Sequence, residues 1–252
     1  MIIDSHCHAG RGDGLTAPWN SDAPLDKYLR RARKAGIEKT LVVPAFHSDY
    51  SQANEELARI VAKSHGRLIG FAMIHPRNDA GRVNEMLATA KRIGLRGVKI
   101  HAHDALPGRE VFEAARRYRL PVLYDVGGKA HVIDIVASQY PEVPIIVPHL
   151  GSFADDFRAH QVVIDQLCRY PNVFADTSGV RRFDYLVEAV RRAGAGKLLF
   201  GSDGPWLHPG LELEKIRLLG LRKSDEAKIL GGNLASIFAI ASEKSVTFLR
   251  PA

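Results

Sequence analysis

The chain has 252 residues, of which 46% are hydrophobic, and its formal net charge is +7 at pH 7. This length and this apolar content suit either two small domains or one larger barrel. The two cysteines, Cys7 and Cys168, exclude a disulfide framework, and no apolar run is long enough to span a bilayer.

The N-terminal residues lack the basic segment and apolar stretch of a secretory signal peptide. Two thiols far apart in the sequence also fit a reducing compartment, so we expect a cytoplasmic protein without a membrane partner. The excess positive charge would attract anionic ligands at long range. Much of it lies in arginine doublets on predicted helix surfaces, where it is solvated, so a small molecule rather than nucleic acid is the expected partner.

Eight short apolar runs rich in β-branched residues recur along the chain, and each predicts a buried strand. Between them, apolar residues recur at helical spacing, as in the set Leu25, Tyr28, Leu29 and Ala32. The predicted strands lie at residues 1–4, 40–46, 68–74, 95–100, 121–126, 143–148, 172–177 and 197–202.

Alternation of strands and helices implies parallel strands joined by right-handed crossovers. Eight such units in 252 residues favour a closed barrel over an open doubly wound sheet. The sequence therefore predicts an α/β protein with a single (β/α)8 (TIM) barrel domain over residues 1–252. We expect the C-terminal helices, at about 210–242, to pack outside it.

Ionisable residues stand at the C-terminal ends of the predicted strands. From His75 onward they follow one another at intervals of 24–27 residues, close to the length of one strand–helix unit. In a barrel all these ends converge on one face, where the active sites of this fold lie. The residues concerned are His6, His8, His47, His75, His101, Asp125, His149, Asp176 and Asp203.

The segment Asp4-Ser5-His6-Cys7-His8 gives the sharpest local signal. Side chains two apart on a strand share a face, so His6 and His8 both point into the barrel mouth and Cys7 points toward the helices. Barrel closure places Asp203, at the end of the last strand, beside them. Two imidazoles and one carboxylate leave coordination positions open for water and substrate, as a catalytic metal such as zinc requires.

The sequence resembles the amidohydrolase superfamily, in the branch often called amidohydrolase 2, which contains metal-dependent hydrolases and some nonoxidative decarboxylases. The resemblance covers nearly the whole chain. It rests on the segments MIIDSHCH, NEELARIVAKSHGRLIGFAMIHP, LRGVKIHAH, PVLYDVGG, VPHLGS, FADTSG, LLFGSDGPW and GGNLASIF.

The resemblance implies that His6 and His8 bind metal, that His149 polarises the substrate or water, and that Asp203 both binds metal and acts as general base. It also implies one divalent cation, most often zinc, and frequently a homodimer.

The chain departs from this family at one position. Members of the branch usually place a histidine at the end of strand 5 as a further ligand, and here the matching residue is Asp125. Asp125 could bind the metal through oxygen, which would favour a harder ion such as manganese. Alternatively, His101 or His131 supplies the missing nitrogen. In the third reading Asp125 pairs with a base such as Lys99 or Lys129, and the metal site is weak or absent.

Lys99 and His101 share a face of the fourth predicted strand. A lysine ammonium beside a metal would hold the carboxylate of an acidic substrate, so we expect both residues to contact substrate. Arg109 or Arg181 could add a bidentate contact from a loop. Trp206 and Trp19 are candidates to stack on a planar substrate.

The expected reaction is hydrolysis of an ester, lactone or amide carbonyl, with Asp203 taking the proton from a metal-activated water. Three alternatives stay open at this point. The first is nonoxidative decarboxylation on the same site. The second is a TatD-like deoxyribonuclease, although strand 4 carries VKIH instead of the glutamate normal in that family. The third is a non-catalytic barrel that has lost its metal.

Overall fold

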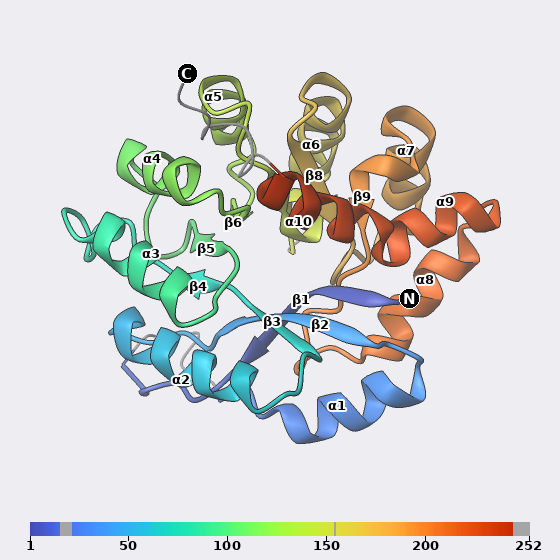
Figure 1. The fold of residues 1–252 in the computed structure, drawn as a ribbon. Helices are drawn as coiled ribbons and strands as arrows, with labels where there is room; N and C mark the ends of the chain where they lie inside the picture. The colour runs from blue at the N-terminus through green and yellow to red at the C-terminus, as the bar shows by residue number, and fades with distance from the viewer. Residues whose placement is uncertain (16–21, 154, 244–252) are drawn as a thin grey trace, which may run out of the picture.

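The strands form a closed parallel barrel (Figure 1). The computed structural model describes residues 1–15, 22–153 and 155–243. Neighbouring strands pair in parallel and in chain order within two sheets, β1-β2-β3 and β4 to β9. The strands are β1 (Ile3–Ala9), β2 (Lys39–Pro44), β3 (Leu68–Gly70), β4 (Ala72–Met73), β5 (Val98–His101), β6 (Val122–Asp125), β7 (Ile145–Val147), β8 (Val173–Asp176) and β9 (Leu198–Leu199).

Backbone hydrogen bonds join the two sheets at both seams. Phe71, the residue between β3 and β4, donates its N–H to the Val42 carbonyl at 2.9 Å, so β3 and β4 act as one barrel strand. At the other seam the Ser5 N–H donates to the Phe200 carbonyl at 2.8 Å and the His8 N–H to the Gly204 carbonyl at 2.6 Å. The result is the predicted (β/α)8 barrel, with eight strands in a ring.

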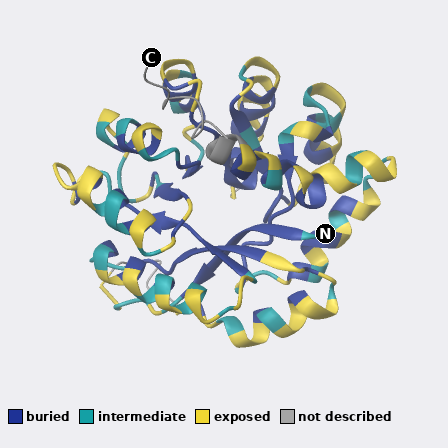
Figure 2. Cartoon of the chain, viewed as in Figure 1, coloured by how far each residue is buried: buried dark blue, intermediate teal, exposed yellow. Residues whose placement is uncertain are grey.

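Helices surround the strands, buried on their inner faces and exposed on their outer faces (Figure 2). In α1, for example, Tyr28 and Ala32 are buried against the barrel, and charged side chains face outward. None of the helices in the described part of the chain combines the length and apolar character needed to span a bilayer. The helices are α1 (Leu25–Lys34), α2 (Tyr50–Ala62), α3 (Val83–Arg92), α4 (Arg109–Tyr118), α5 (Val132–Gln139), α6 (Phe157–Arg169), α7 (Phe183–Ala193), α8 (Pro209–Leu218), α9 (Lys223–Ala227) and α10 (Asn233–Glu243), with shorter turns η1 (Pro148–Gly151), η2 (Ala195–Lys197) and η3 (Lys228–Gly232).

The apolar core has an outer layer between strands and helices and a smaller inner layer within the barrel. The last helix, α10, contributes to the inner layer and lies across one end of the barrel, in front of the strands in Figure 1. Its Phe238 ring packs edge-on against Phe71, with 6.1 Å between the ring centroids. The inner layer comprises Ile3, Leu41, Val43, Ile69, Phe71, Leu123, Ile146 and Leu199 from the barrel with Leu234, Ile237 and Phe238 from α10.

Candidate active site

Two side chains of the first barrel strand and one from the loop after the last strand converge at the C-terminal end of the barrel. The Nε2 atoms of His6 and His8 lie 3.7 and 3.6 Å from Oδ1 of Asp203. Their possible ligand atoms all lie within 4.8 Å of one another, and all three residues are buried. The structure thus brings together the three residues that the His-x-His motif and barrel closure predict.

The outer ring nitrogens of both histidines are already engaged. Nδ1 of His8 lies 3.0 Å from the Pro44 carbonyl, which can only accept, so this nitrogen carries the proton and Nε2 keeps its lone pair. Nδ1 of His6 is hydrogen-bonded to the Ser178 hydroxyl at 3.2 Å, and it lies 3.1 Å from Oδ2 of Asp176. A second partner of this kind is typical of metal-ligating histidines, because it sets both tautomer and ring orientation.

Burial keeps both imidazoles neutral. Burial and the nearby charge of Lys99 together lower the pKa of His6 to about 4, against the opposing effect of Asp176. Burial also lowers the pKa of His8 well below its usual value. Metal ligands must be deprotonated. Two neutral imidazoles beside a carboxylate therefore fit a divalent transition ion, which His6, His8 and Asp203 would hold.

Asp176 is the carboxylate that orients His6, a role that the sequence did not reveal. It is fully buried on β8, and its Oδ1 also accepts from the backbone N–H groups of His149 and Ser178, at 3.0 and 2.9 Å. One carboxylate therefore ties together the strand-end residues of β1, β7 and β8.

Asp176→Asn is expected to weaken metal binding by about 10–100-fold, because the amide cannot hold the His6 imidazole as a carboxylate does. Competition with a chromogenic zinc chelator measures the change. Asp165→Asn, on the exposed side of α6 beside Arg192, serves as the control and should leave zinc affinity unaltered. Unchanged affinity in the Asp176 variant would contradict the orienting role.

Asp203 has the protonation behaviour of a base that works near neutrality. Burial raises its pKa to about 7, against the lowering effect of the positive charges on His149 and Lys99. Its backbone has a left-handed φ of 54°, and its N–H donates to the His6 carbonyl at 2.7 Å. This bond keeps the carboxylate beside the β1 histidines.

His149 is held on a strained turn at the end of β7. His149 and Leu150 have φ values of 58° and 48°, a conformation that costs non-glycine residues roughly 1–3 kcal/mol each. The turn is pinned by His160 of α6, whose Nδ1 lies 3.0 Å from the Leu150 carbonyl. His149 Nδ1 itself lies 2.8 Å from the Ser178 carbonyl, so its Nε2 faces the barrel mouth.

His149 is cationic at neutral pH. Burial alone would lower its pKa, but its ion pair with Asp125 and the negative charge of Asp203 raise the value to about 9. An imidazolium here can donate a hydrogen bond to a developing oxyanion or give up a proton.

Asp125 lies at the end of β6 between two imidazoles. Its Oδ2 is 3.2 Å from His101 Nε2 and 3.5 Å from His149 Nε2, and its Oδ1 accepts from the Gly127 N–H at 2.9 Å. Burial alone would raise its pKa, but His101, His149 and Lys99 lower it well below its usual value. The third reading paired Asp125 with a base such as Lys99 or Lys129, and in the structure the bases that contact the carboxylate are His101 and His149.

The alternative nitrogen donors lie in different environments. His101 Nε2 faces Asp125, and its Nδ1 accepts from the His103 N–H at 2.9 Å. His131 is exposed at the N-cap of α5.

Lys99 is fully buried at the centre of the site. Its Nζ lies 3.2 Å from His6 Nε2, the same atom that would ligate a metal, so this hydrogen bond and metal ligation exclude each other. Burial lowers the pKa of Lys99, whereas Asp125 and Asp203 oppose the shift.

Aromatic rings surround the imidazoles. The Trp206 ring lies 4.5 Å from the His8 ring and is 41% exposed. Phe46 stacks on His8 at 5.7 Å, and Phe153 lies edge-on to His149 at 5.0 Å. Trp19 lies outside the described residues.

Three further candidate site residues pair with carboxylates outside the group formed by His6, His8 and Asp203. Arg181 pairs with Asp155 at 2.7 Å, and Arg109 pairs with Glu113 on the surface of α4. His47 contacts the Asp13 carboxylate at 3.5 Å in the loops above the barrel.

A buried network around Asp4 supports the site from below and was not foreseen. Asp4 accepts hydrogen bonds from the Tyr28 hydroxyl at 2.6 Å, the Ser202 N–H at 2.9 Å and the His6 N–H at 3.1 Å. It thereby joins β1 to α1 and to the residues before Asp203. Its place two residues before His6 was the only signal in the sequence.

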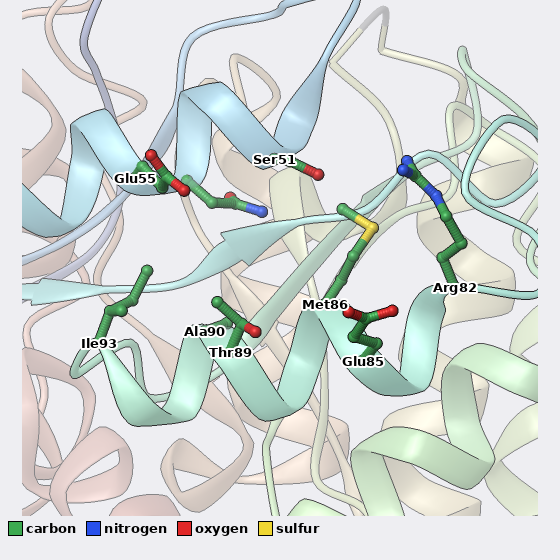
Figure 3. Close-up of a pocket in the computed structure, with 9 residues that line it drawn as sticks. Ser51, Glu55, Arg82, Glu85, Met86, Thr89, Ala90 and Ile93 are labelled. Atoms are coloured by element: carbon green, nitrogen blue, oxygen red, sulfur yellow. The ribbon is translucent and has the colours of Figure 1, made fainter.

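A separate hollow of about 160 Å³ lies on the outside, between α2 and α3. Figure 3 shows Met86 of α3 and Ile93, the residue after α3, directed toward α2, with Ser51 and Glu55 of α2 opposite. Its lining contains none of the residues of the barrel mouth, so we do not assign chemistry to it.

Comparisons with known proteins agree with this geometry. A family model described as amidohydrolase matches residues 3–240, whereas no curated protein matches the chain. A structure from Pseudomonas putida described as a 2-pyrone-4,6-dicarboxylic acid hydrolase is 22% identical, with a TM-score of 0.74 over 95% of this chain and 97% of that one.

Two further solved structures share the fold at lower identity. The 5-carboxyvanillate decarboxylase of Sphingomonas paucimobilis is 16% identical, with a TM-score of 0.72 over 94% and 98% of the two chains. A zinc-bound amidohydrolase from Burkholderia multivorans is 17% identical, with a TM-score of 0.78 over 95% and 99%. The family match spans nearly the whole chain, and the protein therefore belongs to the amidohydrolase family and is an enzyme of that superfamily.

Proposed function

We propose that the protein is a metal-dependent hydrolase that adds water to the ester, lactone or amide carbonyl of a small acidic substrate. The observation that carries this proposal is the convergence of His6 Nε2, His8 Nε2 and Asp203 Oδ1 at the barrel mouth. The similar structures also support it, since they are described as acting on carboxylic acids.

A divalent ion bound by His6, His8 and Asp203 would supply an acidified water and polarise the carbonyl. Zinc suits two imidazoles and one carboxylate, and manganese is the alternative if Asp125 adds a further oxygen.

The chain's own residues supply the proton transfers. Asp203 accepts a proton from the attacking water and returns it to the leaving group. His149, as an imidazolium, donates a hydrogen bond to the carbonyl oxygen on which negative charge develops. Lys99 provides a cation for a substrate carboxylate, and Trp206 covers the pocket beside His8.

Nonoxidative decarboxylation is the second candidate, because the raised pKa of His149 also suits a group that protonates carbon. Product analysis separates the two reactions. Hydrolysis adds one water to the substrate, whereas decarboxylation releases carbon dioxide without adding water.

Protein purified without chelator is expected to contain about one divalent ion per chain. Removing the ion should abolish turnover of carboxylated lactones and aryl esters, and zinc or manganese should restore it. Plasma mass spectrometry measures the ion, and product formation is followed in the same samples.

His8→Ala should lose the ion, and His131→Ala, at the exposed N-cap of α5, should retain it. Full turnover by protein shown to be free of metal would overturn the metal-dependent mechanism. Loss of metal in the His131 variant would instead place that imidazole among the ligands.

A further inference from the structure

We propose that a pocket beside the barrel mouth, flanked by Arg77 and Lys129, binds a second anionic group of the substrate. The inference rests on the proposed function, since it assigns the substrate at least two carboxylates or equivalent anions. One anion would lie at the reacting centre near Lys99, and the other on Arg77 and Lys129.

The pocket adjoins the candidate active site along the chain. It has a volume of about 410 Å³ and is lined by residues of the loops that follow β4, β5 and β6. Ala102, one of its lining residues, directly follows His101 and donates its N–H to the Asp125 carbonyl at 2.8 Å. Lys129 lies four residues beyond Asp125. The lining consists of Pro76, Arg77, Ala102, His103, Asp104, Ala105, Leu106 and Lys129.

The two cations that line the pocket are exposed, and their side chains form no ion pair or hydrogen bond within the described ranges. Arg181 and Arg182, on the loop after β8, are instead neutralised by Asp155 and Asp184. A guanidinium and an ammonium that line one hollow can bind a carboxylate by charge-assisted hydrogen bonds.

The acidic residue of the pocket does not cancel these charges. Asp104 lines the same hollow, but its Oδ2 accepts a hydrogen bond from the Tyr50 hydroxyl at 2.8 Å. With Arg77 and Lys129 cationic and Asp104 anionic, the pocket keeps an excess of positive charge.

The arrangement selects substrates by the spacing of two anions. A monoanion can occupy either the reacting centre or the Arg77 pocket, whereas a dianion of suitable length occupies both at once. Joining two contacts in one ligand raises affinity because the second contact forms within the complex. We therefore expect rigid aromatic or extended aliphatic dicarboxylates to bind more tightly than the matching monocarboxylates.

Isothermal titration calorimetry on the metal-loaded protein tests this expectation with benzoate, isophthalate, terephthalate, butyrate, glutarate and adipate as probes. At least one dicarboxylate should bind wild-type protein roughly tenfold more tightly than its monocarboxylate. Arg77→Gln combined with Lys129→Gln should remove this advantage and change monocarboxylate affinity by less than about twofold.

The matched control is Lys27→Gln combined with Arg30→Gln, which removes the same charge from the exposed face of α1. The proposal is overturned if no dicarboxylate gains affinity over its monocarboxylate. It is also overturned if the pocket variant keeps the gain, or if the control variant loses it equally. Binding is measured without turnover, so this result stands apart from the chelation test of the proposed reaction.

Discussion

Asp203→Asn is expected to lower kcat/KM by roughly 10²–10⁴-fold, because the amide cannot accept the proton that the carboxylate takes from water. The fold should remain intact, since asparagine tolerates the left-handed backbone that Asp203 adopts. Steady-state kinetics on the best substrate of the carboxylated lactone and ester panel, with zinc in excess, measures the loss.

Asp184→Asn provides the matched control, because this exposed carboxylate pairs only with Arg182 among the described residues. Its kcat/KM should stay near the wild-type value. An Asp203→Asn enzyme with near-normal kcat/KM and full metal content would contradict the assignment of Asp203 as the base.

The largest effect on stability is expected from Phe71→Ala, which should reduce the free energy of unfolding by about 3–5 kcal/mol. Phe71 is fully buried in the inner apolar layer of the barrel and contacts Phe238 of α10. The substitution therefore leaves a cavity inside the barrel. Urea unfolding followed by circular dichroism measures the change. Phe157→Ala, at a ring that is 50% exposed on α6, should stay within about 0.5 kcal/mol.

Gly97 provides an independent check on the position of this ring. A Cβ at Gly97 would overlap Phe71 Cζ, so Gly97→Ala should cost about 1–3 kcal/mol in the wild-type background. The cost should be much smaller in the Phe71→Ala background, where the ring is gone. Additive losses in the double variant would show that the ring does not lie against Gly97.

The fold was predictable because its determinants are local and repeated. Each buried strand is a short apolar run, and each helix buries a stripe such as Tyr28 and Ala32. The position of α10 across the barrel end was not visible in this pattern, since its apolar residues show helical spacing without showing which surface they cover.

The centre of the site was also predictable, because strand geometry determines it. His6 and His8 share a strand face, and barrel closure brings Asp203 beside them. The first relation follows from strand geometry alone, and the second also depends on the short loop after β9, which the hydrogen bond from the Asp203 N–H to the His6 carbonyl holds against β1.

The surroundings of this centre were harder to predict. Lys99 has four side-chain torsions, and the rotamer it adopts places Nζ beside His6 Nε2. Asp176 lies at the correct strand end, but its role depends on a 3.1 Å contact with His6 across the barrel. Arg77 and Lys129 belong to loops, whose course carries no periodic signal in the sequence.

Ile3 and Phe238, which are far apart in the sequence, pack in one apolar cluster, so this cluster is complete only after residue 238 has been synthesised. Domains fold as units during synthesis, and contacts between distant residues form slowly. While the ribosome is still adding residues before Asn233, the barrel floor formed by Ile3, Leu41 and Phe71 has no cover from Leu234, Ile237 and Phe238. The nascent chain therefore exposes this apolar surface until α10 has been synthesised. A stalled or shortened product would keep the surface exposed, and through it would aggregate or bind a chaperone.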